Sequence, residues 1–332
     1  MKHGGDLTEA KARHGAGDPP WLDLSTGINP HPWPVPEALR RVGWERLPGA
    51  AEMDALLSAA RIAYRVPAGA DIVAAPGTQA LIQWLPRLAP PGAVAIASPT
   101  YGGHADAWRG ADRGQPPRHR VVVNPNNPDG RIVDIVTLRA MAEACAGAGG
   151  WLIVDEAFAD LEAGISAVGL VPELPVIVLR SFGKFYGLAG LRLGFVVASP
   201  AIAAKLGGAL GDWAVSGPAL AVGAAALADE VWAEGMRARL TEEATALDRV
   251  LAAAGLEAAG GTSLYRLVRH PEAGALHAHL AAAHIWCRRF EEAPEFLRFG
   301  LPPDAGGLAR LRAALSSHVQ GTRIASPATS AR

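Results

Sequence analysis

Short apolar runs alternate with longer stretches of helical spacing between residues 49 and 235. Six of these runs are predicted to be strands: Ile72–Ala74, Ala93–Ala97, Val121–Val123, Trp151–Val154, Val176–Leu179 and Phe195–Val197. Runs that are apolar at every position are typical of strands whose sheet is covered by helices on both faces. The pattern therefore predicts an α/β fold, with a mostly parallel, doubly covered sheet in a large domain of residues 49–235.

The two ends of the chain have a different pattern. Residues 1–48 are rich in Pro and Gly, notably at 29–36, and predict an extended arm and part of a smaller domain. An alanine-rich helical segment at 219–254 leads into residues 236–332, the C-terminal part of that α+β domain. Strands are expected at 263–268 and 295–299, a helix at 308–318, and a frayed tail after residue 321.

Composition and charge narrow the class of partner. The 332 residues are 50% hydrophobic and 19% charged, as in an ordinary globular enzyme. The net charge of −1 provides no general attraction for nucleic acid or an anionic membrane, and the most apolar window, 213–228, is too short and interrupted to span a bilayer. The balanced charge therefore favours a small-molecule partner. Cys145 and Cys287 are too few for a disulfide framework or a four-thiolate metal site, so a cytoplasmic location and no metal are expected.

Lys184 stands at the most specific chemical position of the chain. Only four lysines accompany twenty-seven arginines, and this one directly follows a predicted buried strand. A partly desolvated amine near Arg192 would have a lowered pKa, as a lysine that forms a Schiff base requires. Ser181 and Arg192 could together hold a phosphate group. An isolated lysine in such a position is more often a solvated loop residue. The choice between this explanation and a Schiff-base lysine therefore depends on the neighbouring motifs.

Asp155 follows the predicted strand Trp151–Val154, at the edge where open parallel sheets bind ligands. A buried aspartate needs a partner, and a protonated pyridine nitrogen would be a suitable one. A helix cap is the alternative explanation.

Three further segments follow predicted strands. Residues 124–130 form a turn-rich sequence, and Gly77 and Thr78 precede a helical stretch whose free backbone N–H groups suit an anion. Tyr101 could stack on a planar ligand. Taken singly, these segments are equally consistent with a turn, a helix start and a packed tyrosine.

Together, in this order, the five segments resemble the fold-type I, aspartate-aminotransferase-like pyridoxal phosphate enzymes, over nearly the whole chain. The branch concerned holds the histidinol-phosphate aminotransferases and the threonine-phosphate decarboxylases. The resemblance implies that Lys184 forms the Schiff base, that Asp155 pairs with the pyridine nitrogen, that Asn127 donates to O3′ and that Tyr101 stacks on the ring.

The resemblance also implies how the cofactor phosphate is held. Its ligands would be the backbone at Gly77 and Thr78, with Ser181 and Arg192. Tyr64 matches a tyrosine that reaches the phosphate in the neighbouring subunit, which implies a homodimer with shared active sites.

Substrate residues follow from the same resemblance. Arg298 corresponds to the arginine that binds the substrate α-carboxylate, and Arg288 to the arginine upstream of it. Arg310 and Arg312 compete for the role, but their spacing fits a surface helix.

Two motifs and one departure favour the decarboxylase side. His3-Gly4-Gly5 and the segment containing Asn29 resemble the start of the threonine-phosphate decarboxylases of cobalamin biosynthesis, and Asn29 is expected to contact substrate. Phe158 replaces the tyrosine typical of histidinol-phosphate aminotransferases. For the substrate phosphate we expect His3 and Arg131 as ligands; the alternatives are a frayed terminus and a solvated turn residue.

The expected activity is pyridoxal-phosphate-dependent decarboxylation of L-threonine O-3-phosphate to (R)-1-amino-2-propanol O-2-phosphate. A histidinol-phosphate aminotransferase, which uses the same residues to transfer an amine, stays open as the alternative. A pyridoxal-phosphate-sensing transcription factor would need an additional basic DNA-binding segment, and the chain has none.

Overall fold

The computed structural model describes residues 4–111 and 116–325, with side chains as far as residue 318. The chain forms two compact units. One comprises Met1–Pro30 with Arg237–Arg332, and the other is His31–Met236.

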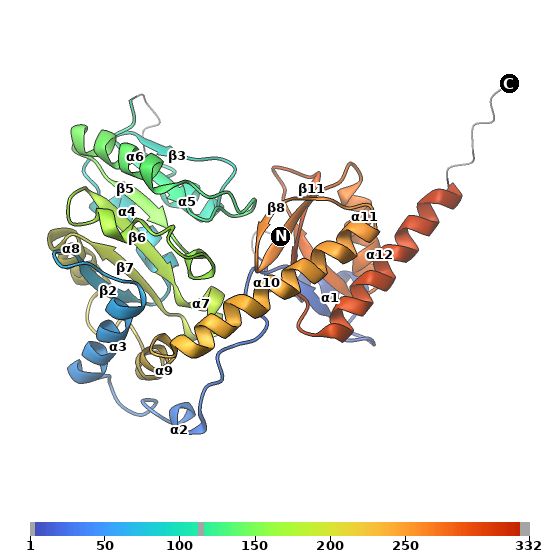
Figure 1. The fold of residues 1–332 in the computed structure, drawn as a ribbon, viewed down its shortest axis with the longest axis horizontal. Coiled ribbons are helices and arrows are strands. Elements are labelled where there is room, and N and C mark those ends of the chain that lie inside the picture. The colour runs from blue at the N-terminus through green and yellow to red at the C-terminus, as the bar shows by residue number, and fades with distance from the viewer. Residues whose placement is uncertain (1–3, 112–115, 326–332) are drawn as a thin grey trace. The chain divides into compact units, whose positions relative to one another are not determined.

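The larger unit contains a sheet in which six strands can be assigned within the described residues (Figure 1). In spatial order they are β2 (Asp71–Ala75), β7 (Gly194–Ala198), β6 (Val176–Ser181), β5 (Leu152–Asp155), β4 (His119–Val123) and β3 (Val94–Ile96). The β3–β4, β4–β5 and β5–β6 pairs are parallel, whereas β7 is antiparallel to both β2 and β6. The predicted α/β class with a mostly parallel sheet is confirmed.

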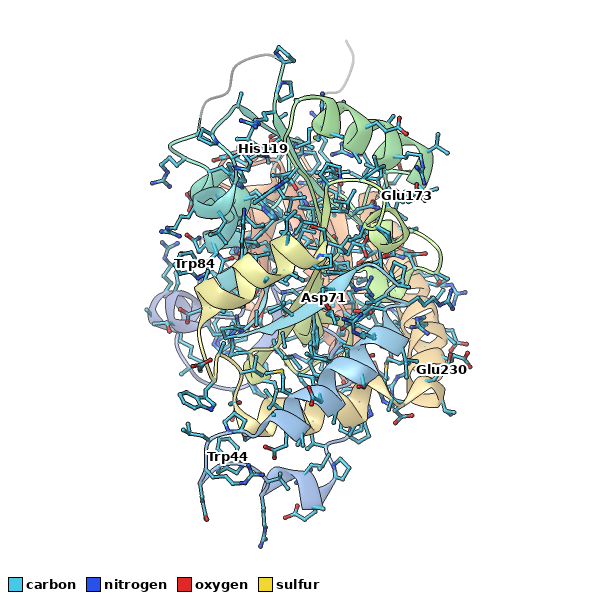
Figure 2. All side chains as sticks on the ribbon, turned by 90° about the vertical axis from the view of Figure 1, so that its left-hand side faces the viewer. Trp44, Asp71, Trp84, His119, Glu173 and Glu230 are labelled. Atoms are coloured by element: carbon cyan, nitrogen blue, oxygen red, sulfur yellow. The ribbon has the colours of Figure 1, made fainter. Side chains whose placement is uncertain are left out.

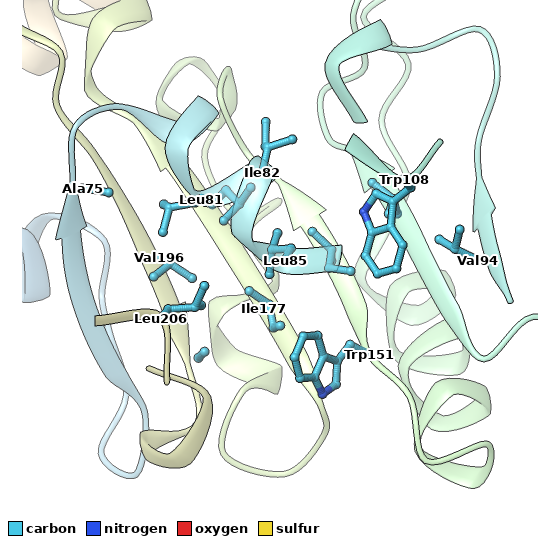
Figure 3. Packing of buried hydrophobic residues seen from close by; sticks show 14 residues of the cluster. Ala75, Leu81, Ile82, Leu85, Val94, Trp108, Trp151, Ile177, Val196 and Leu206 are labelled. Atoms are coloured by element: carbon cyan, nitrogen blue, oxygen red, sulfur yellow. The ribbon is translucent and has the colours of Figure 1, made fainter. Parts of the chain in front are cut away.

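Helices surround this sheet. The α-helices described wholly within the larger unit are α2 (Glu37–Arg40), α3 (Ala50–Ala63), α4 (Thr78–Leu88), α5 (Gly102–Ala107), α6 (Ile135–Gly147), α7 (Phe182–Phe185), α8 (Pro200–Leu210) and α9 (Gly217–Leu227). Figure 3 shows how α4 and α8 pack on the sheet: Leu81 and Leu85 of α4 and Leu206 of α8 join Ile177 and Val196 in one buried cluster. This apolar contact holds the start of α4 beside the strand ends.

The helical segment predicted over 219–254 is in fact two helices, α9 and α10 (Glu230–Ala253), and that prediction is corrected. The break falls at Asp229, whose carboxylate Oδ1 accepts a hydrogen bond from the backbone N–H of Trp232 at 3.0 Å. An aspartate that accepts from the third residue of a helix is a strong N-terminal cap, so a new helix begins there.

The smaller unit contains a second sheet. Its strands, in spatial order, are β1 (Leu22–Leu24), β10 (Ile285–Arg289), β11 (Phe296–Gly300), β9 (Tyr265–Arg269) and β8 (Ala258–Thr262). β1 is parallel to β10 and the other pairs are antiparallel. The accompanying helices are α1 (Thr8–His14), α11 (Ala273–Ala282) and α12 (Ala305–Ala325). The strands expected at 263–268 and 295–299 are present as β9 and β11, while β1 and β8 had no clear sequence signal.

The surface of the larger unit carries some isolated apolar side chains. Trp44, in the segment between α2 and α3, is 72% exposed (Figure 2).

Within the described part of the chain, no helix is both long and apolar enough to cross a lipid bilayer.

Candidate active site

Strand direction brings the predicted cofactor residues of the larger unit to one edge of its sheet. Parallel strands β4, β5 and β6 end at Val123, Asp155 and Ser181, and Val123 lies opposite Asp155 in the register. β2 ends at Ala75, and both Ala75 and Ser181 lie opposite Gly194 of β7. The segments that follow these strands therefore share the carboxyl edge, where open α/β sheets bind ligands.

Asp155 is buried at this edge, with 3% of its surface exposed. Its Oδ2 lies 2.8 Å from Nε2 of His104, which is completely buried, and its Oδ1 accepts from the N–H of Ala157 at 3.1 Å. Because a carboxylate accepts and does not donate, Nε2 of His104 carries the proton in this bond. The role of His104 was not predicted from the sequence; its position three residues after Tyr101 was the available signal.

Tyr101 connects His104 to the start of α4. Its ring meets the His104 ring edge-on, with centroids 6.1 Å apart, and its hydroxyl donates to Oε1 of Gln79 at 3.0 Å. A Cβ on Gly103 would lie 2.4 Å from the tyrosine ring, so only glycine leaves room for it there. The structure thus links the segments after β2 and β3 through three side chains.

Gly77 and Thr78 form a cradle with Arg192. Gly77 has φ +81° and precedes α4, whose first N–H groups have no acceptor within the helix. A Cβ on Gly77 would lie 2.7 Å from Nη2 of Arg192, and a Cβ on Gly194 would lie 2.7 Å from the backbone nitrogen of Thr78. Glycine at both positions lets a guanidinium and a strand approach the helix N-terminus, which is an arrangement suited to an anion.

Asn127 belongs to a loop held by two neighbouring asparagines. The side chain of Asn124 exchanges two hydrogen bonds with the backbone of Val133, at 2.8 and 3.1 Å. The side chain of Asn126 donates to the Pro99 carbonyl at 2.9 Å and accepts from the Thr100 hydroxyl at 2.7 Å. The loop after β4 is thereby fixed to the loop after β3. The role of Asn127 stays a prediction, whereas the structural roles of Asn124 and Asn126 were not predicted from the sequence.

Lys184 lies on α7, directly after β6, and is partly buried. Ser181, at the end of β6, is 8% exposed. Gly183 allows close packing of this helix, because a Cβ there would lie 2.8 Å from Cα of Ala189. The predicted lowering of the lysine pKa stays a prediction.

Tyr64 occupies a different environment from the one expected. It is 4% exposed, and the guanidinium carbon of Arg180 lies 4.5 Å from its ring centroid. Arg180 also forms buried ion pairs with Glu156, at 2.8 Å, and with Asp160. Burial, together with the Asp160 carboxylate, raises the pKa of Tyr64 well above its usual value. The Tyr64 hydroxyl is buried within its own unit, and its contact with the cofactor phosphate of a neighbouring subunit stays a prediction.

Arg298 is the most enclosed cation of the smaller unit's candidate residues, with 7% exposure. It donates to the carbonyl of Ser25 at 3.0 Å and lies over the Tyr265 ring at 4.8 Å. In the register of β10 and β11, Arg288 lies directly opposite it. The two arginines predicted for the substrate are therefore neighbours on one face of this sheet.

The His-Gly-Gly segment reaches the same part of the smaller unit. His3 lies outside the described residues, but Gly5 donates its N–H to the Ser25 hydroxyl at 2.9 Å. A Cβ on Gly4 would lie 2.3 Å from the Ser25 carbonyl oxygen, the atom that accepts from Arg298. Asn29 is also in this unit and is 2% exposed.

Arg131, expected to contact the substrate phosphate, forms a local ion pair with Asp129 at 3.5 Å and is half exposed. Its own backbone N–H donates to the same carboxylate at 3.0 Å. These contacts fit the alternative explanation, a residue that closes the turn after Asn127.

Comparison with known proteins identifies the class. The sequence matches the family described as aminotransferase class I and II over residues 114–315. The chain therefore belongs to this family, and the resemblance expected from the sequence is confirmed.

Particular relatives are similar over their full length. The chain is 47% identical to a threonine-phosphate decarboxylase from Sinorhizobium sp over 327 residues, which covers 95% of this chain and 97% of that protein. It is 41% identical to a threonine-phosphate decarboxylase from Pseudomonas aeruginosa over 329 residues, with the same coverage of both chains. Its fold is similar to the crystal structure of histidinol-phosphate aminotransferase from Sinorhizobium meliloti in complex with pyridoxal-5′-phosphate, with a TM-score of 0.82 at 20% identity, covering 96% of this chain and 95% of that one.

Proposed function

We propose that this protein is a pyridoxal-phosphate-dependent decarboxylase that converts L-threonine O-3-phosphate to (R)-1-amino-2-propanol O-2-phosphate, a step of cobalamin biosynthesis. The observation that carries the proposal is the 47% identity with a threonine-phosphate decarboxylase over nearly the whole of both chains. The packing of Gly4 and Gly5 against Ser25 supports it, because it gives the decarboxylase-like opening motif a defined place.

The residues of the larger unit fit pyridoxal phosphate. Asp155 is a buried carboxylate at the ligand edge of the sheet, as an anion that pairs with a pyridinium nitrogen must be. The backbone at Gly77 and Thr78, beside Arg192, offers N–H groups and a cation to a phosphate, and Ser181 adds a hydroxyl. We assign the ring-stacking role to Tyr101 and the contact with O3′ to Asn127.

The bound cofactor would supply an electron sink for the electrons of the bond that breaks between Cα and the carboxylate. Asp155 keeps the proton on the pyridine nitrogen, and the hydrogen bond from His104 fixes the orientation of its carboxylate. The guanidinium of Arg298 binds and orients the substrate carboxylate. Nζ of Lys184 holds the cofactor before substrate arrives and then delivers a proton to Cα.

The remaining parts of the proposal concern the substrate phosphate, assembly and location. We assign the phosphate of the substrate to Arg288 and the His3 segment, with Asn29 as a further contact. The proposed assembly is a homodimer with shared active sites. A cytoplasmic location is consistent with two buried, unpaired cysteines, Cys145 and Cys287.

The test is a pair of assays on one preparation of enzyme with pyridoxal phosphate. Release of CO₂ from L-threonine O-3-phosphate is expected. Transfer of the amine from histidinol phosphate to 2-oxoglutarate is expected to be absent or much slower. Efficient amine transfer without CO₂ release would establish the aminotransferase and overturn the proposal.

A further inference from the structure

Trp33, in the proline-rich arm, is buried against the segment that carries Lys184. It is 5% exposed. Its backbone N–H donates to the carbonyl of Tyr186 at 2.9 Å, and its indole Nε1–H donates to Oδ2 of Asp229 at 3.0 Å. Trp33 thus connects the arm to the end of α7 through its backbone and to the start of α10 through its side chain.

Both oxygens of Asp229 are used. Oδ2 accepts from Trp33, and Oδ1 accepts from the N–H of Trp232 at 3.0 Å. The ring of Trp232 stacks on that of Tyr186, with centroids 5.6 Å apart and planes inclined by 14°. The Tyr186 ring stacks in turn on Phe182, at 4.5 Å and 7°. The contacts that begin at Trp33 therefore return to α7 through three stacked rings.

Helix α7 needs such support. It comprises four residues, Phe182–Phe185, and one helical turn has no stability of its own in water. Phe182 and Tyr186 are four positions apart, so they share a face, and Lys184, two positions from each, belongs to the opposite face. The stacked rings hold the face that carries Phe182 and Tyr186 in place. Because the turn is rigidly held on that face, the direction in which Lys184 projects from the opposite face is also fixed.

We propose that Trp33 and Asp229 are positioning residues for Lys184, acting through Tyr186 and the backbone of α7. The inference rests on the proposed function, in which Lys184 holds the cofactor. The hydrogen bond between the indole and the carboxylate holds the arm and the start of α10 on Tyr186, and this keeps the amine at the distance and angle that the reaction requires.

Two conservative variants break this one hydrogen bond. Trp33→Phe removes the N–H donor and keeps an aromatic ring. Asp229→Asn keeps an oxygen for the N–H of Trp232, as asparagine also caps helices well, but presents an NH₂ group to the indole N–H. Loss of the bond frees the arm and the start of α10 from Tyr186, and a small displacement of a reacting amine slows the chemical step, so each variant is expected to lose on the order of tenfold in kcat with KM unchanged. The double variant is expected to be no worse than the more impaired single variant, because both remove the same interaction.

The matched control is Trp44→Phe. Trp44 also donates its indole N–H, to the carbonyl of Arg40 at 2.8 Å, but it is exposed and lies in the segment between α2 and α3. Its variant is expected to keep the kinetics of the parent protein. Circular dichroism on all variants shows whether the fold is retained, and Asp229→Asn carries the test if Trp33→Phe unfolds.

Two measurements do not depend on turnover. The visible absorption band of the bound cofactor is expected to titrate at a different pH in Trp33→Phe and Asp229→Asn, and amide hydrogen exchange over residues 182–187 is expected to be about tenfold faster. The inference would be overturned if Trp33→Phe and Asp229→Asn had the same kinetics, the same titration of the absorption band and the same exchange rates as Trp44→Phe. Absence of the band in the parent protein, or its persistence in Lys184→Ala, would instead overturn the proposed function.

Discussion

Arg288 of β10 and Arg298 of β11 lie directly opposite each other across an antiparallel strand pair. Like charges in that position destabilise a sheet, and the Arg298 side chain is also buried. Burial, followed by the nearby charge of Arg288, lowers the pKa of Arg298 to about 10. Below that pH the guanidinium is charged in both the folded and unfolded protein, so the whole cost of burying it is present at pH 7. An anionic ligand at this pair would offset that cost.

The first prediction concerns Arg298→Met. Loss of a bidentate contact to the substrate carboxylate, at about 1.5 to 3 kcal/mol for each of its two bonds, is expected to raise KM by at least about a hundredfold. The thermal midpoint of the unliganded protein is expected not to fall, because the buried charge is removed as well. Steady-state kinetics and thermal unfolding measure the two effects. The control is Arg310→Met, on the surface of α12, which is expected to leave KM unchanged. A KM effect in Arg310→Met and none in Arg298→Met would reverse the assignment.

The second prediction concerns the bond between His104 and Asp155. His104→Phe removes the donor to a buried carboxylate and is expected to lower both kcat and the affinity for pyridoxal phosphate by about tenfold. His104→Gln can still donate to that carboxylate and is expected to recover most of both values. Cofactor titration followed by absorbance, with kcat, decides the matter. Equal losses in both variants would indicate a packing role for the imidazole in place of the hydrogen bond.

The third prediction concerns Gly194→Ala. Its Cβ would lie 2.7 Å from the nitrogen of Thr78, so β7 and the start of α4 must separate. We expect a fall of at least about tenfold in cofactor affinity, since a shift of a few tenths of an ångström weakens the backbone contacts to a phosphate. Gly207→Ala in α8 is the control, because its Cβ meets nothing closer than 3.9 Å and alanine favours a helix. Unchanged affinity in Gly194→Ala would mean that the cradle does not hold the phosphate.

The fourth prediction concerns acid stability. Burial, assisted by the charge of Arg289, lowers the pKa of His277 to about 4. Between pH 6.5 and pH 4 the unfolded state therefore binds more protons than the folded state. Protonation of His277 costs the folded protein no stability above pH 6.5, and it lowers the free energy of unfolding progressively as the pH falls below 6.5. At pH 5 it amounts to about 2 kcal/mol of lost stability. Thermal unfolding of the parent and of His277→Gln at pH 7 and pH 5 is expected to show a smaller acid loss in the variant. Parallel losses would show that His277 is not the group that titrates.

The sequence predicted the elements whose signal is local. Val176–Leu179 and Trp151–Val154 are apolar on both faces, and they form central strands of the larger sheet. Strand β8 was missed because its sequence, Ala-Ala-Gly-Gly-Thr, has low strand propensity and is held by pairing with β9. The break at Asp229 was missed because alanine-rich sequence on both sides masks the cap.

The site residues that could be predicted are those that come directly after an apolar strand in the sequence, as Asp155 and Lys184 do. A contact with a partner distant in sequence was not predictable. His104 is 51 residues from Asp155, and no local pattern connects them. The enclosure of Tyr64 by Arg180 depends in the same way on tertiary packing that only the folded chain reveals.

The antiparallel direction of β7 has a consequence for the order of folding. A strand parallel to β6 would need a crossover helix to return to the start of the sheet, whereas β7 leaves from the edge at which β6 ends. Residues 182–193, which contain Lys184 and Arg192, are therefore a short closed loop, and the other strand pairs of this sheet enclose longer stretches of chain. Short loops cost the least entropy to close and pair soonest. The loop that carries the lysine is thus expected to take shape early, as a local nucleus on which the distant strand β2 later docks.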